Sequence, residues 1–437
     1  MKRACAAALA AVLWAQPVWA DPAAEKAATL PDLKAAAAAG GAEAENRLGL
    51  AYFNGEIVKQ DFVQARQWFE KAAAQGYRAA EYNLGVIYDD GDGVAPDAAQ
   101  AFNWYKKAAD QGDVSAAAQV GGMYMRGAGV GADTAAGMRY LLTAAAAGDA
   151  TAETMLGYAY HNGLGMKADA QAALEWYRLA AGDDDATAMY NLGQMYFDGE
   201  GVAEDDKTGF AWMKKAAERG DSDAQNMLGR CYREGWGVDR DDAQALIWYQ
   251  KAADQDNAAA QDNLAWMYEN GYGVAEDDAK AYALYVKAAA NGDDDAQERA
   301  ALLLLQGIGV TKDADAALKI LTERARKTAA AKATMGLVYL RGLGVAADYA
   351  RALDWLTQAA EAGDAWAQYK LGDMYAGALG VKQDRRTALT WYLIAAANGS
   401  DAARDAAAAL RRQISHGDAA AAEAAARAFK PSPAPSA

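Results

Sequence analysis

The chain repeats itself about every 36 residues, and this internal period constrains its fold more than any other feature. Eight of the nine spacings between matching positions are 36 residues and one is 35. Self-similarity at a fixed period of this length is typical of solenoids, in which each unit buries its apolar face against its neighbours. The ten matching positions, called anchors below, are Leu48, Leu84, Val120, Leu156, Leu192, Leu228, Leu264, Ala300, Met335 and Leu371.

The first half of each unit predicts an α-helix with one buried face. Ala stands four residues before the anchor in all ten copies, and Tyr stands four residues after it in nine. Spacings of four residues align side chains along one face of a helix. Gly follows the anchor directly in several copies, as at Gly49, Gly85 and Gly193, where it would let a neighbouring helix approach closely.

The first helix is predicted to end at a Gly-x-Gly-Val turn, as at residues 91–94, because glycine readily adopts the left-handed cap conformation. Three residues after this Val position every copy has Asp, whose carboxylate can accept hydrogen bonds from the free amides that begin a second helix. That second helix alternates Ala with large aromatic residues and usually ends at Gly, as at Gly112. The ten predicted N-caps are Asp61, Asp97, Asp133, Asp169, Asp205, Asp241, Asp277, Asp313, Asp348 and Asp384.

These features together resemble the Sel-one-like repeat (SLR) family, a relative of the tetratricopeptide repeat. The resemblance spans residues 42–400, which we take as ten repeats. It implies an all-α fold, a right-handed α-solenoid of about ten helix-turn-helix repeats. It also implies a role as an adaptor or scaffold, which is the role of most members.

The segments outside the repeats predict export and capping. Residues 1–20 read as a signal peptide, with Lys2 and Arg3, an apolar stretch and a small-residue cleavage pattern, so the mature protein is expected in the periplasm or secreted. Residues 21–41 form a lead-in, residues 401–430 a C-terminal helical cap, and residues 431–437 a disordered tail. No later segment is apolar enough to predict membrane insertion of the mature chain.

The charge of the chain argues against nucleic acid as a partner. The sequence has 43 basic and 59 acidic residues, a formal net charge of −16. Loss of Lys2 and Arg3 with the signal peptide leaves 41 basic residues against 59 acidic ones, or −18. A field of this sign repels phosphate backbones and anionic headgroups.

No constellation of residues predicts catalysis, a metal or a cofactor. None of the serines has Lys three residues on, as a serine β-lactamase would need, and two His and two Cys are too few for most metal chemistry. Residues 207–209, Lys-Thr-Gly, match a third β-lactamase motif, but Gly209 occupies a position that is small in every repeat. Some relatives have been described as β-lactamases, so an envelope hydrolase remains the enzymatic alternative.

Two other features receive a structural interpretation. Cys231 stands at a position that is apolar in all other repeats, which favours a core residue over a redox site. The Asp runs at residues 183–185 and 293–295 lack the spaced oxygens and final Glu of a calcium loop, so we interpret them as helix caps in turns.

Positions where the repeats disagree indicate a candidate binding surface. Residues five and two before the anchor, and two and five after it, form one stripe along the first helix, away from its core face. The corresponding stripe of tetratricopeptide repeats lines a concave groove, and aromatic residues with Arg are common anchors of protein interfaces. Packing between neighbouring first helices is the alternative for each residue. The candidate partner-binding residues are Tyr82, Tyr158, His161, Tyr190, Phe197, Arg230, Arg233, Trp266, Trp366 and Tyr369.

Repeat eight departs most from the pattern. Ala300 is its anchor, Leu304 replaces Tyr, Ile320 replaces Trp, and the unit is one residue short. We therefore expect a bend or change of pitch there, with two rigid blocks meeting at residues 294–335.

The sequence as a whole predicts an exported scaffold that binds a partner protein or peptide in the groove. Envelope signalling and assembly of surface polysaccharide machinery are two processes that the resemblance allows. Aromatic faces also suit sugars, so a module that binds glycan or peptidoglycan is the other alternative.

Overall fold

The computed structural model describes residues 29–431, which contain 23 α-helices and no strand. The predicted signal peptide, and all but the first residue of the predicted tail, lie outside this range. The chain forms two compact units that meet in sequence at Arg240 and Asp241. Unit 1 contains α1 (Leu30–Ala38), α2 (Ala42–Asn54), α3 (Phe62–Ala74), α4 (Arg78–Asp90), α5 (Ala98–Asp110), α6 (Val114–Arg126), α7 (Thr134–Ala146), α8 (Ala150–Asn162), α9 (Ala170–Gly182), α10 (Ala186–Asp198), α11 (Asp206–Glu218) and α12 (Ser222–Glu234). Unit 2 contains α13 (Asp242–Ala253), α14 (Ala258–Asn270), α15 (Asp278–Ala290), α16 (Asp294–Gln306), α17 (Ala314–Ala325), α18 (Ala329–Arg341), α19 (Tyr349–Glu361), α20 (Ala365–Gly377), α21 (Arg385–Ala397), α22 (Asp401–Arg411) and α23 (His416–Ala428).

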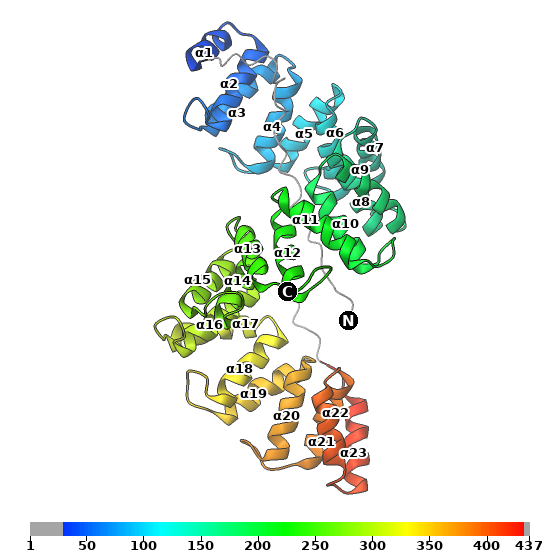
Figure 1. The fold of residues 1–437 in the computed structure, drawn as a ribbon, viewed down its shortest axis with the longest axis vertical. Coiled ribbons are helices and arrows are strands. Elements are labelled where there is room, and N and C mark those ends of the chain that lie inside the picture. The colour runs from blue at the N-terminus through cyan, green and yellow to red at the C-terminus, as the bar shows by residue number, and fades with distance from the viewer. Residues whose placement is uncertain (1–28, 432–437) are drawn as a thin grey trace. The chain divides into compact units, whose positions relative to one another are not determined.

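Within each unit the helices stack as hairpins in chain order (Figure 1). The first and second helices of a repeat pack against each other, as α4 does on α5, and each second helix packs on the next first helix. First helices of consecutive repeats also contact each other, as α6 does with α8 and α18 does with α20. The helix pairs therefore stack one on the next along each unit, and the predicted α-solenoid is confirmed.

The ten Asp residues that precede the second helices are N-caps, as predicted. In repeat two the Asp97 carboxylate accepts hydrogen bonds from the backbone amides of Ala99 and Gln100, both at 3.0 Å. The Asp97 amide in turn donates to the carbonyl oxygen of Tyr88, at 2.8 Å, at the end of the first helix. One residue thus ties both helices of the hairpin to the turn between them. The same capping bond is present in all ten repeats.

The two glycines of the Gly-x-Gly-Val turn have different roles. In repeat three Gly127 ends α6 in the left-handed conformation, with φ of 69°. Gly129, with φ of 68°, lies so close to the start of α5 that a Cβ there would overlap the Ala98 carbonyl. The first glycine therefore caps the helix, and the second lets the turn touch the preceding repeat.

Small residues at the core face allow the two helices of a hairpin to interlock. In repeat four a Cβ at Gly157 would lie 2.6 Å from the Tyr177 ring, which is completely buried. Cys231 is also completely buried, in agreement with its interpretation as a core residue. Aromatic rings packed on glycine-containing helices are thus the recurring unit of the core.

The ends of the repeat array are covered by extra helices. Leu33 and Ala37 of α1 pack against Leu48 and Ala51 of repeat one. At the other end α22 and α23 pack on α21, and the Phe429 ring meets Trp391 at 5.6 Å. Of the helices in residues 29–431, none is both long enough and apolar enough to cross a membrane.

Repeat eight does not divide the molecule, contrary to our expectation. One apolar cluster extends from Ala301 on α16 to Met374 on α20, so repeats eight to ten share a core. The boundary between the two compact units lies instead at Arg240, inside repeat six. The prediction of two blocks meeting at residues 294–335 is therefore wrong, because the compact units meet in sequence at Arg240 and Asp241.

Candidate partner-binding surface

Two of the predicted surface residues are buried. Tyr82 is 2% exposed, and its ring lies 5.5 Å from that of Tyr105 on the second helix of the same repeat. Phe197 is 4% exposed. These two residues belong to the core, so their prediction as partner-binding surface residues is wrong.

Phe197 is buried because its ring packs against a glycine in the second helix of its repeat. Gly209 on α11 replaces the Ala found at this position in most repeats, and a Cβ there would lie 2.9 Å from the Phe197 ring. Repeat three has the same arrangement, with Gly137 on α7 and Met125 on α6, where a Cβ would lie 2.8 Å from the sulfur. A large residue five positions after the anchor, together with Gly in the second helix, thus indicates close packing of the two helices there, although Met125 stays half-buried.

In repeats four and five the stripe is half-buried and internally hydrogen-bonded. The ring of His161, at the end of α8, lies 2.6 Å from a carboxylate oxygen of Glu200 in the turn after α10. On α10 the Gln194 side-chain amide donates to the Tyr190 hydroxyl at 2.8 Å. Tyr158 is half-buried on α8, and burial raises the pKa of its hydroxyl. The two hydrogen-bonding contacts hold the His161 ring and the Tyr190 hydroxyl in fixed positions.

Repeat six contributes the arginines. The Arg230 guanidinium lies 4.7 Å from the centre of the Trp236 ring, and this ring lies 6.4 Å from that of Phe197. Arg233 contacts the neighbouring Glu234 carboxylate at 2.8 Å. The structure therefore brings Arg230 and Phe197 together through Trp236, a residue that the sequence reasoning missed.

The missed residues share one position. Glu200, Trp236 and Tyr272 each stand between the two glycines of a Gly-x-Gly turn. The first two reach the stripe of the preceding repeat, at His161 and Phe197, and the third stacks on Trp266 of its own repeat. Because the residue type at this position varies widely among the repeats while most of them keep both glycines, its variation is the sequence signal that could have indicated a surface position.

In unit 2 the predicted aromatic residues lie on α14 and α20. The rings of Trp266 and Tyr272 stack at 4.8 Å with an interplanar angle of 20°. Trp366 on α20 is 37% exposed, and the Lys370 ammonium lies 4.4 Å from the ring of Tyr369 on the same helix. Trp366 is thus the most exposed of the ten predicted residues.

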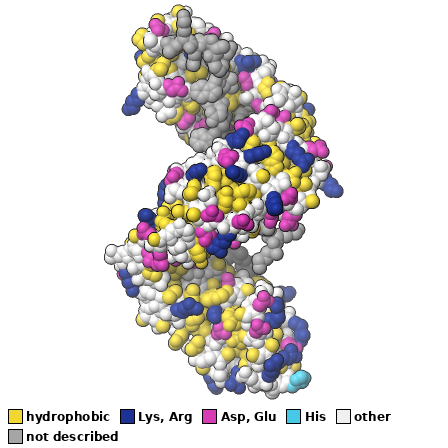
Figure 2. All heavy atoms as spheres, viewed as in Figure 1, with side chains coloured by type: hydrophobic (Ala, Val, Ile, Leu, Met, Phe, Trp, Pro, Cys, Tyr) yellow, Lys and Arg dark blue, Asp and Glu magenta, His cyan; other side chains and the backbone are white. Residues whose placement is uncertain are grey.

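Charges along the stripe of unit 2 are mostly compensated. Arg299 lies 3.7 Å from Asp262, and Lys370 lies 2.8 Å from Asp373. Burial raises the pKa of Asp262 to about 6, and Arg299 acts in the opposite direction. On the face shown in Figure 2, acidic and basic side chains are interspersed among apolar ones and form no large patch of one sign.

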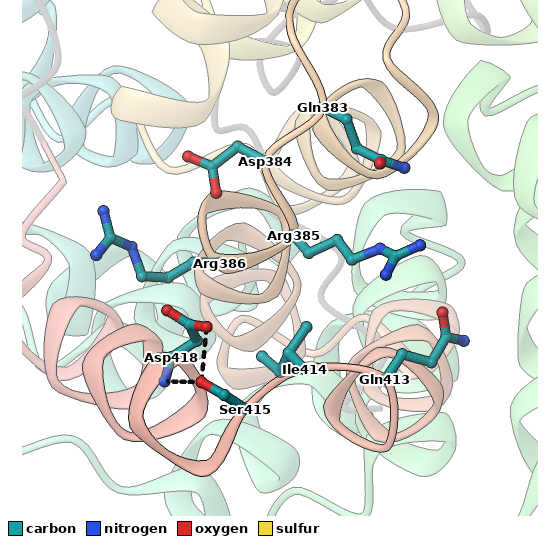
Figure 3. A pocket seen from close by; sticks show the side chains of 8 residues that line it. All are labelled: Gln383, Asp384, Arg385, Arg386, Gln413, Ile414, Ser415 and Asp418. Atoms are coloured by element: carbon teal, nitrogen blue, oxygen red, sulfur yellow. Dashed lines mark hydrogen bonds between the residues drawn. The ribbon is translucent and has the colours of Figure 1, made fainter.

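A polar cavity of about 450 Å³ lies away from the stripe, between the start of α21 and the α22–α23 turn (Figure 3). Arg385 and Arg386 point to opposite sides of it, and the Ser415 hydroxyl bonds Asp418 at 2.7 Å. The two guanidinium groups do not converge, so the cavity has no single anion-binding centre. The other lining residues are Gln383, Asp384, Gln413 and Ile414.

The residues considered for catalysis have structural roles. The amide and hydroxyl of Thr208 both donate to the Asp205 carboxylate, so residues 207–209 are the capped first turn of α11. Within residues 29–431 no group of three or more His, Cys, Asp or Glu side chains is placed to hold a metal ion. Asp185 and Asp293, from the two Asp runs, are N-caps of α10 and α16.

Comparison with known proteins identifies the family. The Sel1 repeat model matches ten segments, at residues 42–77, 78–113, 114–149, 150–185, 186–221, 222–257, 258–293, 294–323, 329–364 and 367–400. The chain therefore belongs to the Sel1 repeat family, whose fold is commonly a protein-interaction scaffold and typically non-catalytic. The search of curated proteins found no match.

Two solved structures are similar over most of their length. A protective antigen of uropathogenic Escherichia coli, c5321, displays an SLR fold and is 32% identical, over 92% of this chain and 94% of that one, with a TM-score of 0.50. A Sel1 repeat protein from Oxalobacter formigenes is 33% identical, over 71% of this chain and 90% of that one, with a TM-score of 0.49.

Proposed function

We propose that the protein is an exported scaffold that binds a partner protein or peptide along the first helices of repeats four to six. Aromatic and charged side chains held at fixed positions on a rigid surface are typical anchors of protein interfaces. Tyr158, His161, Tyr190 and Arg230 would provide these anchors, with little change in the backbone on binding. Envelope signalling or assembly of surface polysaccharide machinery are the processes in which we place it.

The observation that supports the proposal is the contrast between constant and variable positions. The residues that fill the core and cap the helices hardly change from repeat to repeat, whereas the position two residues after the anchor is Tyr158 in repeat four, Gln194 in repeat five and Arg230 in repeat six. All three are only half-buried. A partly exposed stripe whose residue types vary along a repeat array can provide a binding surface with distinct subsites.

Crosslinking of the mature chain in its native envelope, followed by mass spectrometry, tests this proposal. A variant with Tyr158→Ala, Tyr190→Ala and Arg230→Ala should lose crosslinks to its partner while keeping its helical content. The matched control is Leu179→Ala on α9, a second-helix residue that is 55% exposed. Equal recovery of the same partners by the triple variant and the control would contradict the proposal.

A glycan or peptidoglycan ligand is the second candidate, favoured by Trp366. An aromatic face that is 37% exposed can stack on a sugar ring. Saturable binding of the purified protein to sacculi, abolished by Trp366→Ala, would support a glycan ligand. Binding that is unaffected by Trp366→Ala would count against this site.

Export is tested separately. We expect the chain isolated from the periplasm or medium to begin at Asp21, and N-terminal sequencing of that material checks it. An intact Met1 in the fractionated protein would contradict export through this segment.

A further inference from the structure

A side-chain hydrogen bond joins the two helices in several repeats, always between the same two positions. The first position is three residues before the anchor, and the second is thirty residues later, just after the end of the second helix. Each bond has an amide donor and an oxygen acceptor. The pairs are Gln75 to Glu45 at 2.7 Å, Gln111 to Glu81 at 2.6 Å, Asn291 to Gln261 at 3.0 Å and Asn398 to Gln368 at 2.8 Å.

Repeat four has carboxyl groups at both of these positions. Glu153 on α8 takes the acceptor position, and Asp183, just after α9, takes the place of the amide donor. Glu153 is 6% exposed, and its Oε2 has no hydrogen-bond partner among residues 29–431. A buried carboxylate oxygen without a donor is strongly unfavourable, so this position calls for an explanation.

The groups that act on Glu153 are acidic. Burial raises the pKa of its carboxyl above the usual 4.5, and the carboxylates of Asp183, Asp149 and Asp185 raise it further. Asp149 precedes α8, and the other two lie in the turn between α9 and α10. Arg219 contacts this turn, but its guanidinium pairs with Asp184, at 3.0 Å from Nε.

The neighbouring carboxylates already have donors of their own. Asp149 accepts from the Ala152 amide at 2.8 Å and from the Ser115 hydroxyl at 3.2 Å. Asp185 accepts from the Ala188 amide at 2.7 Å and from the Thr154 hydroxyl at 3.1 Å. Glu153 is therefore the group of the cluster that lacks a donor, and a bond from it to the exposed Asp183 in place of the amide bond of other repeats requires a proton on Glu153.

We propose that repeat four contains a proton-dependent joint, in which protonated Glu153 donates a hydrogen bond to Asp183 and holds α8 against the end of α9. When the proton leaves to solvent, two carboxylates face each other and the contact loosens. In repeats one and two the donor is a Gln amide, so the hydrogen bond to the Glu carboxylate needs no added proton. The joint is thus a local device that responds to pH.

The direction of the response follows from linkage. The pKa of Glu153 is higher in the folded chain than its usual 4.5, so the joint contributes its full stability below that value. The contribution falls as the pH rises through the folded-state pKa. Because α8 also carries Tyr158 and His161, a looser joint would displace the proposed partner surface, a consequence that rests on the proposed function. The joint itself does not depend on it.

Hydrogen exchange of the full chain, measured by mass spectrometry between about pH 5 and pH 8 and corrected for intrinsic rates, tests the joint directly. The opening equilibrium of the amides in the first two turns of α8 should increase as the pH rises. The increase should approach about tenfold for each unit by which the folded-state pKa of Glu153 exceeds its usual value. Partner binding plays no part in this readout, so failure of the joint and failure of the proposed function are distinguishable.

Three variants test whether the pH dependence of α8 arises from the Glu153–Asp183 pair. Asp183→Gln restores the pair of repeats one and two, and it should reduce the pH dependence in α8 and increase protection near pH 8. Glu175→Gln removes a charge from the exposed side of α9 and should leave the pH dependence as it is. Gln111→Asp should transfer the pH dependence to α4 in repeat two. Equal pH dependence of α8 in Asp183→Gln and Glu175→Gln would overturn the proposal, as would pH-independent protection of α4 in Gln111→Asp.

Discussion

Repeats two and eight have the same turn and caps but different interfaces between their helices. In repeat two Gly85 lets the Tyr105 ring pack directly on α4, and Gln111 donates a hydrogen bond to Glu81. In repeat eight Ala301 and Leu321 take the places of that glycine and tyrosine, and both are almost fully buried. The helix interface therefore tolerates a change of partners that preserves volume.

Repeat eight also contains a buried cation. Arg324 is 4% exposed at a position where other repeats have Ala, and its Nη1 lies 2.6 Å from Asp294 at the start of α16. Its caps nevertheless follow the pattern, with Gly307 left-handed at the end of α16 and Asp313 accepting from the Ala316 amide at 3.0 Å. The difference teaches that the turn and caps define the hairpin, while the interface between the helices can vary.

The sharpest test of that conclusion is substitution of the second turn glycine in both repeats. Gly309 in repeat eight has φ of 66°, and a Cβ there would overlap the Asp278 carbonyl. We expect Gly309→Ala to destabilise the repeat by about 2–5 kcal/mol, adding about 1–2 for the left-handed backbone to about 1–3 for overpacking. Hydrogen exchange resolved by repeat measures the loss. Gly93→Ala in repeat two should cause a loss of similar size. If Gly309→Ala caused little loss, the turn of repeat eight would not have the same structural role as the turn of repeat two.

The interface should behave differently in the two repeats. Gly85→Ala places a methyl group in overlap with the buried Tyr105 ring, so we expect a loss of about 1–3 kcal/mol. The reverse change in repeat eight, Ala301→Gly, removes only one methyl group and adds backbone freedom, at about 1 kcal/mol. Denaturant unfolding of the two variants, followed by the tryptophan signal and by exchange, gives the comparison. Equal losses would mean that the two interfaces are not distinct.

The features predicted correctly from the sequence are those specified within a few residues. An Asp N-cap needs only the amides two and three positions later, so Asp97 and Asp313 could be identified without knowledge of the partner helix. A left-handed glycine such as Gly307 is likewise set by its own backbone. Because these residues recur at the same position of the repeats, the sequence also indicated that their role is structural.

The errors concern residues whose environment comes from another helix. Tyr82 and Phe197 occupy the predicted stripe, but each is buried by a second helix, through the Tyr105 ring in one case and the space above Gly209 in the other. Glu200 was missed because its partner, His161, lies 39 residues earlier in the chain. Side-chain direction along one helix does not determine such contacts, since they depend on how closely two helices approach.

The buried cation of repeat eight provides a smaller test. Removing the carboxylate with Asp294→Ala leaves Arg324 buried without its partner, and we expect a loss of about 1–2 kcal/mol. This is below the usual value for a buried pair, because Asp294 is 63% exposed and water can replace it in part. Arg324→Leu should be nearly neutral, because an apolar side chain restores the Ala-like environment of other repeats. Unfolding midpoints of the two variants decide between these outcomes, and a larger loss for Arg324→Leu would show that the ion pair itself maintains the interface.

A modest loss of stability is expected at the N-caps, and here the two repeats should agree. Asp97→Ala and Asp313→Ala each remove a carboxylate that accepts from the first amides of a second helix, with an expected loss of about 0.5–2 kcal/mol. Both residues are exposed, so neither change leaves a cavity. Hydrogen exchange of the first turns of α5 and α17 measures the loss locally. If the caps stabilise the hairpin independently of the helix interface, the two losses will match, although the interfaces of the two repeats differ. A markedly greater loss in repeat eight would mean that the stability of its altered helix interface depends on the cap, so that cap and interface are coupled.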